Sequence, residues 1–161
     1  MDKQYPLTVA VTGASGTLYA VRLAQALIEL KRPFHIVLSD AAKEVWRFEM
    51  GRPLGQTPYQ IRQSLAQAFG SEDFTLFDVH SLTAPPASGS VKSAGMVVVP
   101  CSMGTLAHIA HGLADNLIHR AADVVLKEKR PLIIVPREAP LSAIHLENML
   151  KLANLGAQLE S

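Results

Sequence analysis

Four short apolar runs, each rich in β-branched residues, most constrain the fold of this chain. They are "LTVAVT" at residues 7–12, "FHIVLS" at 34–39, "GMVVVP" at 95–100 and "PLIIVP" at 131–136. A run that is apolar at nearly every position, rather than at every second one, is typical of a strand buried on both faces of a parallel sheet. The runs therefore predict central strands with helices packed on both sides.

Between and after these runs, apolar residues recur at intervals of three and four, which is the pattern of amphipathic helices. The expected helices cover residues 18–30, 41–50, 105–112, 115–127 and 142–153. Strands that alternate with helices pair in parallel through right-handed crossovers, so the expected fold class is α/β with a doubly wound parallel sheet. Residues 74–78 are a weaker candidate strand. Gly156 predicts the end of the last helix, and the residues after it do not read as the strand that such a fold would place next.

The composition points to one domain. Of the 161 residues, 48% are hydrophobic and 18% are charged, which is enough apolar surface for a single core over residues 1–161. The formal net charge of +1 lacks the basic excess of a nucleic-acid-binding protein. Cys101 is the one cysteine, no charged-then-apolar leader precedes the first strand, and the apolar runs are far shorter than the roughly 20 residues that cross a bilayer. We therefore expect a cytoplasmic protein that binds neither nucleic acid nor a membrane.

One stretch has a biased composition. The segment "SLTAPPASGSVKSAG" at residues 81–95 is rich in Pro, Ser and Gly and predicts an irregular loop. Because ordered loops longer than about 12 residues are usually functional, we expect this loop to serve the function of the protein.

The turn "GASG" joins the first strand to a helix within "VAVTGASGTLYAVRLAQAL", residues 9–27. Such a turn leaves backbone N–H groups pointing outward at a helix N-terminus, where the helix dipole also favours an anion. The turn therefore predicts a phosphate site.

A dinucleotide-binding dehydrogenase is one interpretation of this turn. Short-chain dehydrogenases have a loop that resembles TGxxxGxG, whereas Thr17 and Tyr19 stand at the positions of its later glycines. Those enzymes also pair a Tyr with a Lys four residues on, and none of the three tyrosines here is followed by a lysine at that spacing. Asp40, after the second strand, is either a ribose ligand or a helix-capping residue. The sequence disfavours this class.

Further polar groups follow the other central strands. Ser39 ends the second run, "CSMGT" at residues 101–105 follows the third, and Arg137 and Glu138 follow the fourth. Carboxyl ends of parallel strands meet at one edge of the sheet, where doubly wound folds bind ligands. Hydroxyls, free N–H groups and one guanidinium suit a single phosphate with a flat polar ring. A mononucleotide therefore fits better than a dinucleotide.

Several segments together carry a family resemblance. They are "TGASG", Ser39, "ASGS" at residues 87–90, "PCSMGTLA", "GLADNLIHRAADVVLKEKRPLIIVPREAPLS" and "HLENMLKL". These segments span nearly the whole chain and resemble the UbiX-like flavin prenyltransferases, formerly described as aromatic acid decarboxylases. The resemblance implies a flavodoxin-like, three-layer αβα Rossmann fold with FMN between the subunits of a homo-oligomer, commonly a dodecamer built from trimers.

The resemblance also implies a reaction. It is the metal-independent transfer of a dimethylallyl group from dimethylallyl phosphate to FMN, which makes prenylated FMN. That product is the cofactor of UbiD-like decarboxylases, which act in ubiquinone synthesis in many bacteria.

The site residues are carried over from the same resemblance. Those implied for FMN are Gly13, Ala14, Ser15, Ser39, Ser102, Met103, Gly104, Thr105 and Arg137. Those implied at the prenyl phosphate are Arg137 and the catalytic residues Ser15, Glu49, Lys127 and Glu138. Lys127 and Arg137 suit the negative charge that develops on a departing phosphate, and the two glutamates suit proton transfer. Trp46 is a candidate π face for the allylic cation.

Each of these residues also has an explanation that needs no ligand. Glu49 near a helix end is compatible with a solvated charge, and Lys127 with a favourable interaction at a helix C-terminus. Ser102 is compatible with an ordinary helix start, and Arg137 and Glu138 with an ion pair to each other.

Two other residue types are candidates for chemistry. His108 and His111 lie three residues apart on an expected helix, but no carboxylate or thiolate is spaced to complete a metal site, so none is expected. Cys101 is interpreted as a small buried residue rather than a nucleophile.

Two other functions stay open at this point. One is an FMN-dependent cysteine decarboxylase of the same fold, although such enzymes use a catalytic His and a "PXMNXXMW" segment that this sequence lacks. The other is a non-catalytic FMN carrier or partner subunit.

The end of the sequence also bears on function. Members of the resembled family continue past "HLENMLKLANLGA" through a strand and a segment with "PAFY", whose tyrosine, with a later arginine, binds the prenyl phosphate. Nothing after Gly156 matches that tail. Either the tail is left out of this sequence or the chain is shortened. In either case we expect residues 1–161 to bind dimethylallyl phosphate more weakly and to form a smaller assembly.

Overall fold

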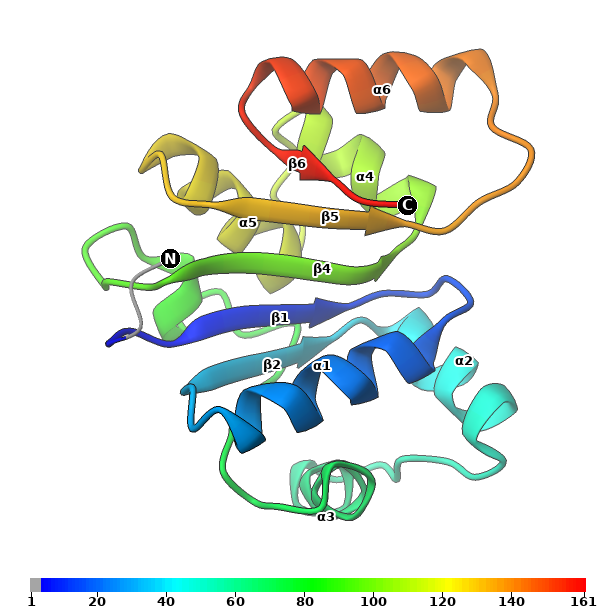
Figure 1. The fold of residues 1–161 in the computed structure, drawn as a ribbon, viewed down its shortest axis with the longest axis vertical. Coiled ribbons are helices and arrows are strands. Elements are labelled where there is room, and N and C mark those ends of the chain that lie inside the picture. Colours follow the sequence, from blue (N-terminus) through cyan, green and yellow to red (C-terminus); the bar gives the residue numbers. More distant parts are fainter. Residues whose placement is uncertain (1–3) are drawn as a thin grey trace.

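A six-stranded parallel sheet forms the centre of the computed structural model, which describes residues 4–161 (Figure 1). In chain order the elements are β1 (Leu7–Val11), α1 (Thr17–Glu29), β2 (Phe34–Leu38), α2 (Asp40–Met50), α3 (Pro58–Phe69), β3 (Thr75–Phe77), the 3₁₀ turn η1 (Pro85–Ala87), β4 (Gly95–Cys101), α4 (Met103–Ala110), α5 (Leu117–Lys127), β5 (Leu132–Pro136), α6 (Ala143–Asn154) and β6 (Gln158–Leu159). Every helix within residues 4–161 is too short or too polar to cross a bilayer.

The strand order is β3-β2-β1-β4-β5-β6, and all of the pairings are parallel. The chain builds outward from β1 to β3, then returns to place β4 beside β1 on the other side. This reversal between β1 and β4 is the point at which doubly wound sheets bind ligands, beyond the carboxyl ends of the strands. The loops after β1, β4 and β5 emerge at that edge of the sheet (Figure 1).

The two faces of the sheet carry separate hydrophobic cores. Successive residues of β4 alternate between them: Val97 packs with α1, α2 and α3, whereas Met96 and Val98 pack with α4, α5 and α6. In β1, Val9 and Ala10 divide between the two cores in the same way. Because both faces are covered, every position of these strands is buried, which explains their continuous apolar runs.

The predicted fold class is confirmed, and two elements differ from expectation. Residues 74–78 do contain a strand, β3, at the edge of the sheet beside β2. The helix α3 was not predicted. The expectation that no strand follows Gly156 is wrong, because β6 pairs with β5 through residues 158 and 159. With only two paired residues, β6 has no apolar run that sequence alone could reveal.

Hydrogen bonds from α5, and from Arg130 just after this helix, hold the loop between β3 and β4 in place. The Leu117 amide donates to the carbonyl oxygen of Val79 over 2.7 Å. The Arg130 guanidinium donates to the carbonyl oxygens of Gly89 and Val91 over 2.8 and 2.9 Å. These bonds fix the "ASGS" segment near the amino ends of the strands, since β4 begins directly after this loop at Gly95.

Candidate functional site

The loop between β1 and α1 follows a path that only small residues permit. A Cβ atom at Gly13 would overlap the Cβ atom of Ala41, so the loop packs directly against the start of α2. Gly16 has a φ of 115°, a conformation that L side chains rarely adopt, and it is the N-cap residue of α1. The glycines thus turn the chain sharply enough to present the N-terminus of α1 at the sheet edge.

Glu49, near the end of α2, lies against this helix N-terminus. Its carboxylate accepts hydrogen bonds from the amide of Gly16 over 3.0 and 3.2 Å and from the amide of Thr17 over 2.8 Å. A negative charge here satisfies two amides that lack partners within the helix and interacts favourably with the helix dipole. Glu49 is therefore not merely a solvated charge, because its carboxylate caps the N-terminus of α1.

Thr12 connects this loop to the next one along the sheet edge. Its hydroxyl donates to the carbonyl oxygen of Pro100 and accepts from the amide of Ser102, both over 2.8 Å, and Thr12 is buried. The two loops are therefore held in fixed relation. Sequence analysis missed this residue, although a threonine that ends a buried strand immediately before the glycine turn was a usable signal.

Ser102 begins α4 as its N-cap residue. The Ser102 hydroxyl accepts from the amide of Thr105 over 3.2 Å and donates to the Thr105 hydroxyl over 3.0 Å. Met103 is buried, whereas Gly104 has open space where a side chain would lie. The start of α4 thus presents backbone and hydroxyl groups at the same edge as the start of α1.

Arg137 and Glu138 follow β5 and line an open cavity of about 440 Å³ together with Ser15, Pro136, Ala139 and Ser161. The amide of Arg137 donates to the carbonyl oxygen of Cys101 over 3.1 Å, which ties this loop to the end of β4. The Glu138 carboxylate accepts from the amide of Ala139 over 3.1 Å. Among residues 4–161 no ion pair joins Arg137 to Glu138, so neither charge is neutralised by the other.

Tyr19 is a second residue that sequence analysis missed at this site. The Arg137 guanidinium carbon lies 5.4 Å from the centre of the Tyr19 ring, in a cation–π arrangement. Tyr19 is 56% exposed, so its ring holds the guanidinium at the surface of the site rather than in the core. An aromatic residue in the first helical turn after the glycine turn was the available signal.

Ser39 and Asp40 lie at the start of α2. The Ser39 hydroxyl accepts from the amide of Ala42 over 3.0 Å and is the N-cap. Asp40 contacts Lys43 over 3.7 Å and the ring of His80 over 3.1 Å. Asp40 is thus an acidic residue in the first turn of α2, where the dipole favours it, and a special ribose-binding role is not needed to explain it.

The structure does not bring Lys127 to this site. Lys127 ends α5, close to Gly89 in the loop that precedes β4, and its ammonium group pairs with Glu128 over 2.8 Å. The helix runs antiparallel to the strands, so its end lies at the amino edge of the sheet, opposite the loops that follow β1 and β5 (Figure 1). Within one chain, Lys127 and Arg137 therefore cannot act on the same phosphate.

Two further expectations concern buried residues. Trp46 is 3% exposed and belongs to the core beneath α1 and α2, so the suggestion that it offers a π face to a cation is wrong. Cys101 is fully buried, and burial raises the pKa of its thiol to about 12. The thiol therefore stays protonated and unreactive, which agrees with its interpretation as a structural residue.

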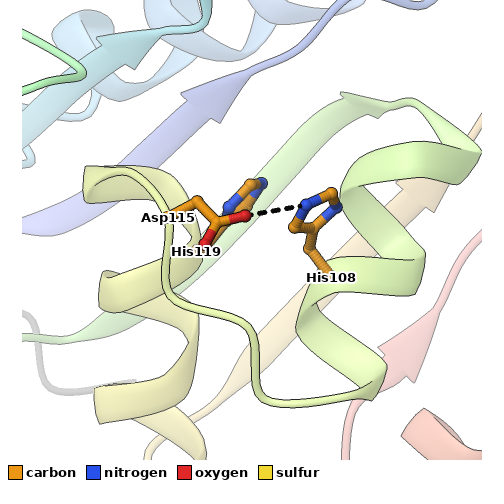
Figure 2. Close-up of side chains that lie close together, drawn as sticks. All are labelled: His108, Asp115 and His119. Carbon is orange, nitrogen blue, oxygen red and sulfur yellow. Dashed lines mark ion pairs between the residues drawn. The ribbon is translucent and has the colours of Figure 1, made fainter.

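The histidines differ from expectation. His111 is bonded to Asn148 over 2.9 Å and is not the partner of His108. Instead His108 lies 3.1 Å from the carboxylate of Asp115 and stacks on the ring of His119 (Figure 2). His108 and His111 therefore do not form a pair, as the spacing argument considered, but the structure does place a carboxylate, that of Asp115, beside His108.

Comparison with known proteins agrees with this geometry. The family described as Flavoprotein matches residues 1–160. The flavin prenyltransferase UbiX of Alkalihalophilus pseudofirmus is 50% identical over 151 residues, which cover 94% of this chain and 74% of that protein.

Two solved structures superpose closely on this chain. One is a dodecameric FMN-dependent UbiX-like decarboxylase from Escherichia coli O157:H7, with a TM-score of 0.82 and 44% identity over 96% of this chain and 78% of the other. The second is AnUbiX (PadA1) in complex with FMN and dimethylallyl pyrophosphate, with a TM-score of 0.82 and 39% identity over 96% and 76% of the two chains. The glycine turn, the capped helix starts and this similarity together show that the chain belongs to the flavoprotein family, within its UbiX-like flavin prenyltransferases.

Proposed function

We propose that this chain transfers a dimethylallyl group from dimethylallyl phosphate to FMN at the carboxyl edge of its sheet. The observation that carries the proposal is the convergence of Ser15, Arg137 and Glu138 on one open cavity beside the N-terminus of α1. Glu49 lies on the amides of that same N-terminus. A site with two carboxylates, a guanidinium and a serine hydroxyl suits a reaction in which phosphate is both bound and released.

The residues at this edge fit a flavin mononucleotide. The starts of α1 and α4 both lie at this edge, and the open space beside Gly104 leaves the start of α4 accessible to a phosphate. The FMN-binding residues proposed are Gly13, Ala14, Ser15, Ser39, Ser102, Met103, Gly104, Thr105 and Arg137. Because Met103 is buried, its contribution comes from the backbone.

The charged residues are proposed to act on the departing phosphate. Breaking the C–O bond of dimethylallyl phosphate leaves negative charge on the phosphate oxygens, which Arg137 stabilises and Ser15 helps to position. Glu49 and Glu138 hold or move a proton at the phosphate or at the ring that receives the dimethylallyl group. FMN, when bound, supplies the nucleophilic ring and the π face that this group requires. The charges needed come from protein side chains, and the proposal assigns no step to a metal ion.

Lys127 is proposed to complete the site from a neighbouring copy of the chain. The amino-edge loop near Gly89 and the end of α5 would then meet the carboxyl edge of another subunit. Support comes from the position of Lys127 far from Arg137 within one chain, together with the dodecameric state of the Escherichia coli relative. We propose a homo-oligomer built from trimers, with a UbiD-like decarboxylase as the recipient of the product.

The test is to incubate the protein anaerobically with reduced FMN and dimethylallyl phosphate and to weigh the flavin by mass spectrometry. We expect a flavin that has gained one dimethylallyl unit. Glu138→Gln should slow its formation while leaving FMN binding intact, whereas Glu147→Gln on the exposed face of α6 should change neither. Unmodified flavin bound tightly by the wild-type protein would instead identify a flavin carrier and refute the proposal.

A further inference from the structure

A cluster of two histidines and one aspartate lies between α4 and α5, outside the site described above. His108 projects from α4, His119 from α5, and Asp115 from the segment that joins the two helices (Figure 2). One potential ligand atom from each of the three residues lies within 4.8 Å of those of the other two. Figure 2 shows the three side chains converging between the helices.

The hydrogen bonding of His108 determines which of its two ring nitrogens carries a proton. Its Nδ1 atom lies 2.8 Å from the carbonyl oxygen of Gly104, an acceptor, so Nδ1 carries a proton and donates it. In the neutral ring, Nε2 then carries no proton and is a hydrogen-bond acceptor. It lies 3.1 Å from a carboxylate oxygen of Asp115, which is also an acceptor. Two acceptors at this distance repel each other unless a proton or a cation lies between them. A backbone carbonyl that fixes the far nitrogen is also the usual support of a metal-binding histidine.

His119 adds a third potential ligand from the protein interior. The side chain is buried, with 7% of the residue exposed, and its Nδ1 atom is buried without a hydrogen-bond partner among the described residues. Its ring stacks on that of His108 with 4.3 Å between the centroids and an angle of 15° between the planes. A buried imidazole nitrogen with no partner costs free energy unless something binds it.

We propose that His108, Asp115 and His119 bind one divalent transition-metal ion, with Zn²⁺ as the reference ion. Two imidazoles and one carboxylate are a ligand set that zinc accepts, with water completing the tetrahedron. Ligand atoms around tetrahedral zinc are roughly 3.3 Å apart, which the His108 and Asp115 atoms already match at 3.1 Å.

The cluster can close on an ion with small movements. The lone pairs of the two stacked rings lie in nearly parallel planes, so one ring must turn before both can point at the same ion. The His108 and Asp115 side chains are 37% and 69% exposed, which gives a path for the ion. A bound ion would join α4 to α5 and stabilise the segment between them. The inference does not rest on prenyl transfer, since none of these residues lines the proposed cavity.

The test is to titrate untagged full-length protein with Zn²⁺ in competition with a chromophoric chelator. We expect one zinc per chain and a rise in melting temperature on binding. Co²⁺ in place of Zn²⁺ should give the intense visible absorption of a tetrahedral site, a readout that needs no variant. Asp115→Asn and His108→Gln, both at partly exposed positions, should each weaken zinc binding at least about tenfold.

The matched control is His80→Gln. His80 also faces a carboxylate, that of Asp40, over the same 3.1 Å, but neither belongs to a group of three possible metal ligands within the described part of the chain. This variant should bind zinc as the wild type does. The proposal fails if the wild type binds no stoichiometric zinc, if the Co²⁺ complex shows only octahedral absorption, or if His80→Gln loses as much affinity as His108→Gln.

Discussion

At the scale of single residues, Glu49 is the side chain whose role changes most between sequence and structure. Its carboxylate caps α1 from another helix, through the amides of Gly16 and Thr17. We expect Glu49→Ala to lower the free energy of unfolding by about 1 kcal/mol, the usual loss when a helix N-terminus loses its cap. Urea denaturation measures this change. Glu49→Gln, which keeps an acceptor oxygen, should lose less.

Glu44→Ala is the matched control for this prediction. Glu44 lies on the same helix, and its ion pair with Arg47 over 3.2 Å is exposed, so its loss should change stability by less than about 0.5 kcal/mol. Equal losses for the two variants would show that the bonds to α1 contribute nothing. Sequence could place Glu49 near a helix end but not against α1, because that contact depends on how two helices meet in space.

At the scale of elements, prediction succeeded where one local pattern determines the element. The central strands were readable because both faces are buried and every position is apolar. The helix α3 was missed because only Ile61, Leu65 and Phe69 are buried along it, a narrow stripe among polar residues. Its ends do carry a signal, since Thr57 and Gln60 form a reciprocal capping box. The topology also predicts that the residues of the carboxyl edge lie together, because parallel strands end at the same edge of the sheet.

The capping box makes α3 testable on its own. The Thr57 hydroxyl accepts from the amide of Gln60 over 3.2 Å. Thr57→Ala removes that acceptor and should lower the free energy of unfolding by about 1 kcal/mol, whereas Thr57→Ser should retain most of it. Chemical denaturation of the three proteins under the same conditions decides between these outcomes. A Ser variant as unstable as the Ala variant would count against the capping role.

At the scale of the whole molecule, the two edges of the sheet carry different parts of one proposed site. Arg137 and Glu138 lie at the carboxyl edge, and Lys127 lies at the amino edge. The chain order already determines this separation, because a helix that precedes a strand ends where the strand begins. The family resemblance grouped these residues by function and left open which copy of the chain supplies each of them. Assembly therefore decides whether the catalytic charges meet.

Mixing two inactive variants tests this directly. Lys127→Ala keeps an intact carboxyl edge, and Arg137→Ala keeps an intact amino edge. If each site combines the two edges from different copies, co-expressing the variants in equal amounts should restore about a quarter of the wild-type sites, by random assembly of two-chain sites. Prenylated flavin formed per chain measures the recovery. Co-expressing Lys127→Ala with a chain that carries both substitutions is the control and should restore nothing. Activity no greater than the average of the two variants alone would show that no site combines Lys127 of one copy with Arg137 of another.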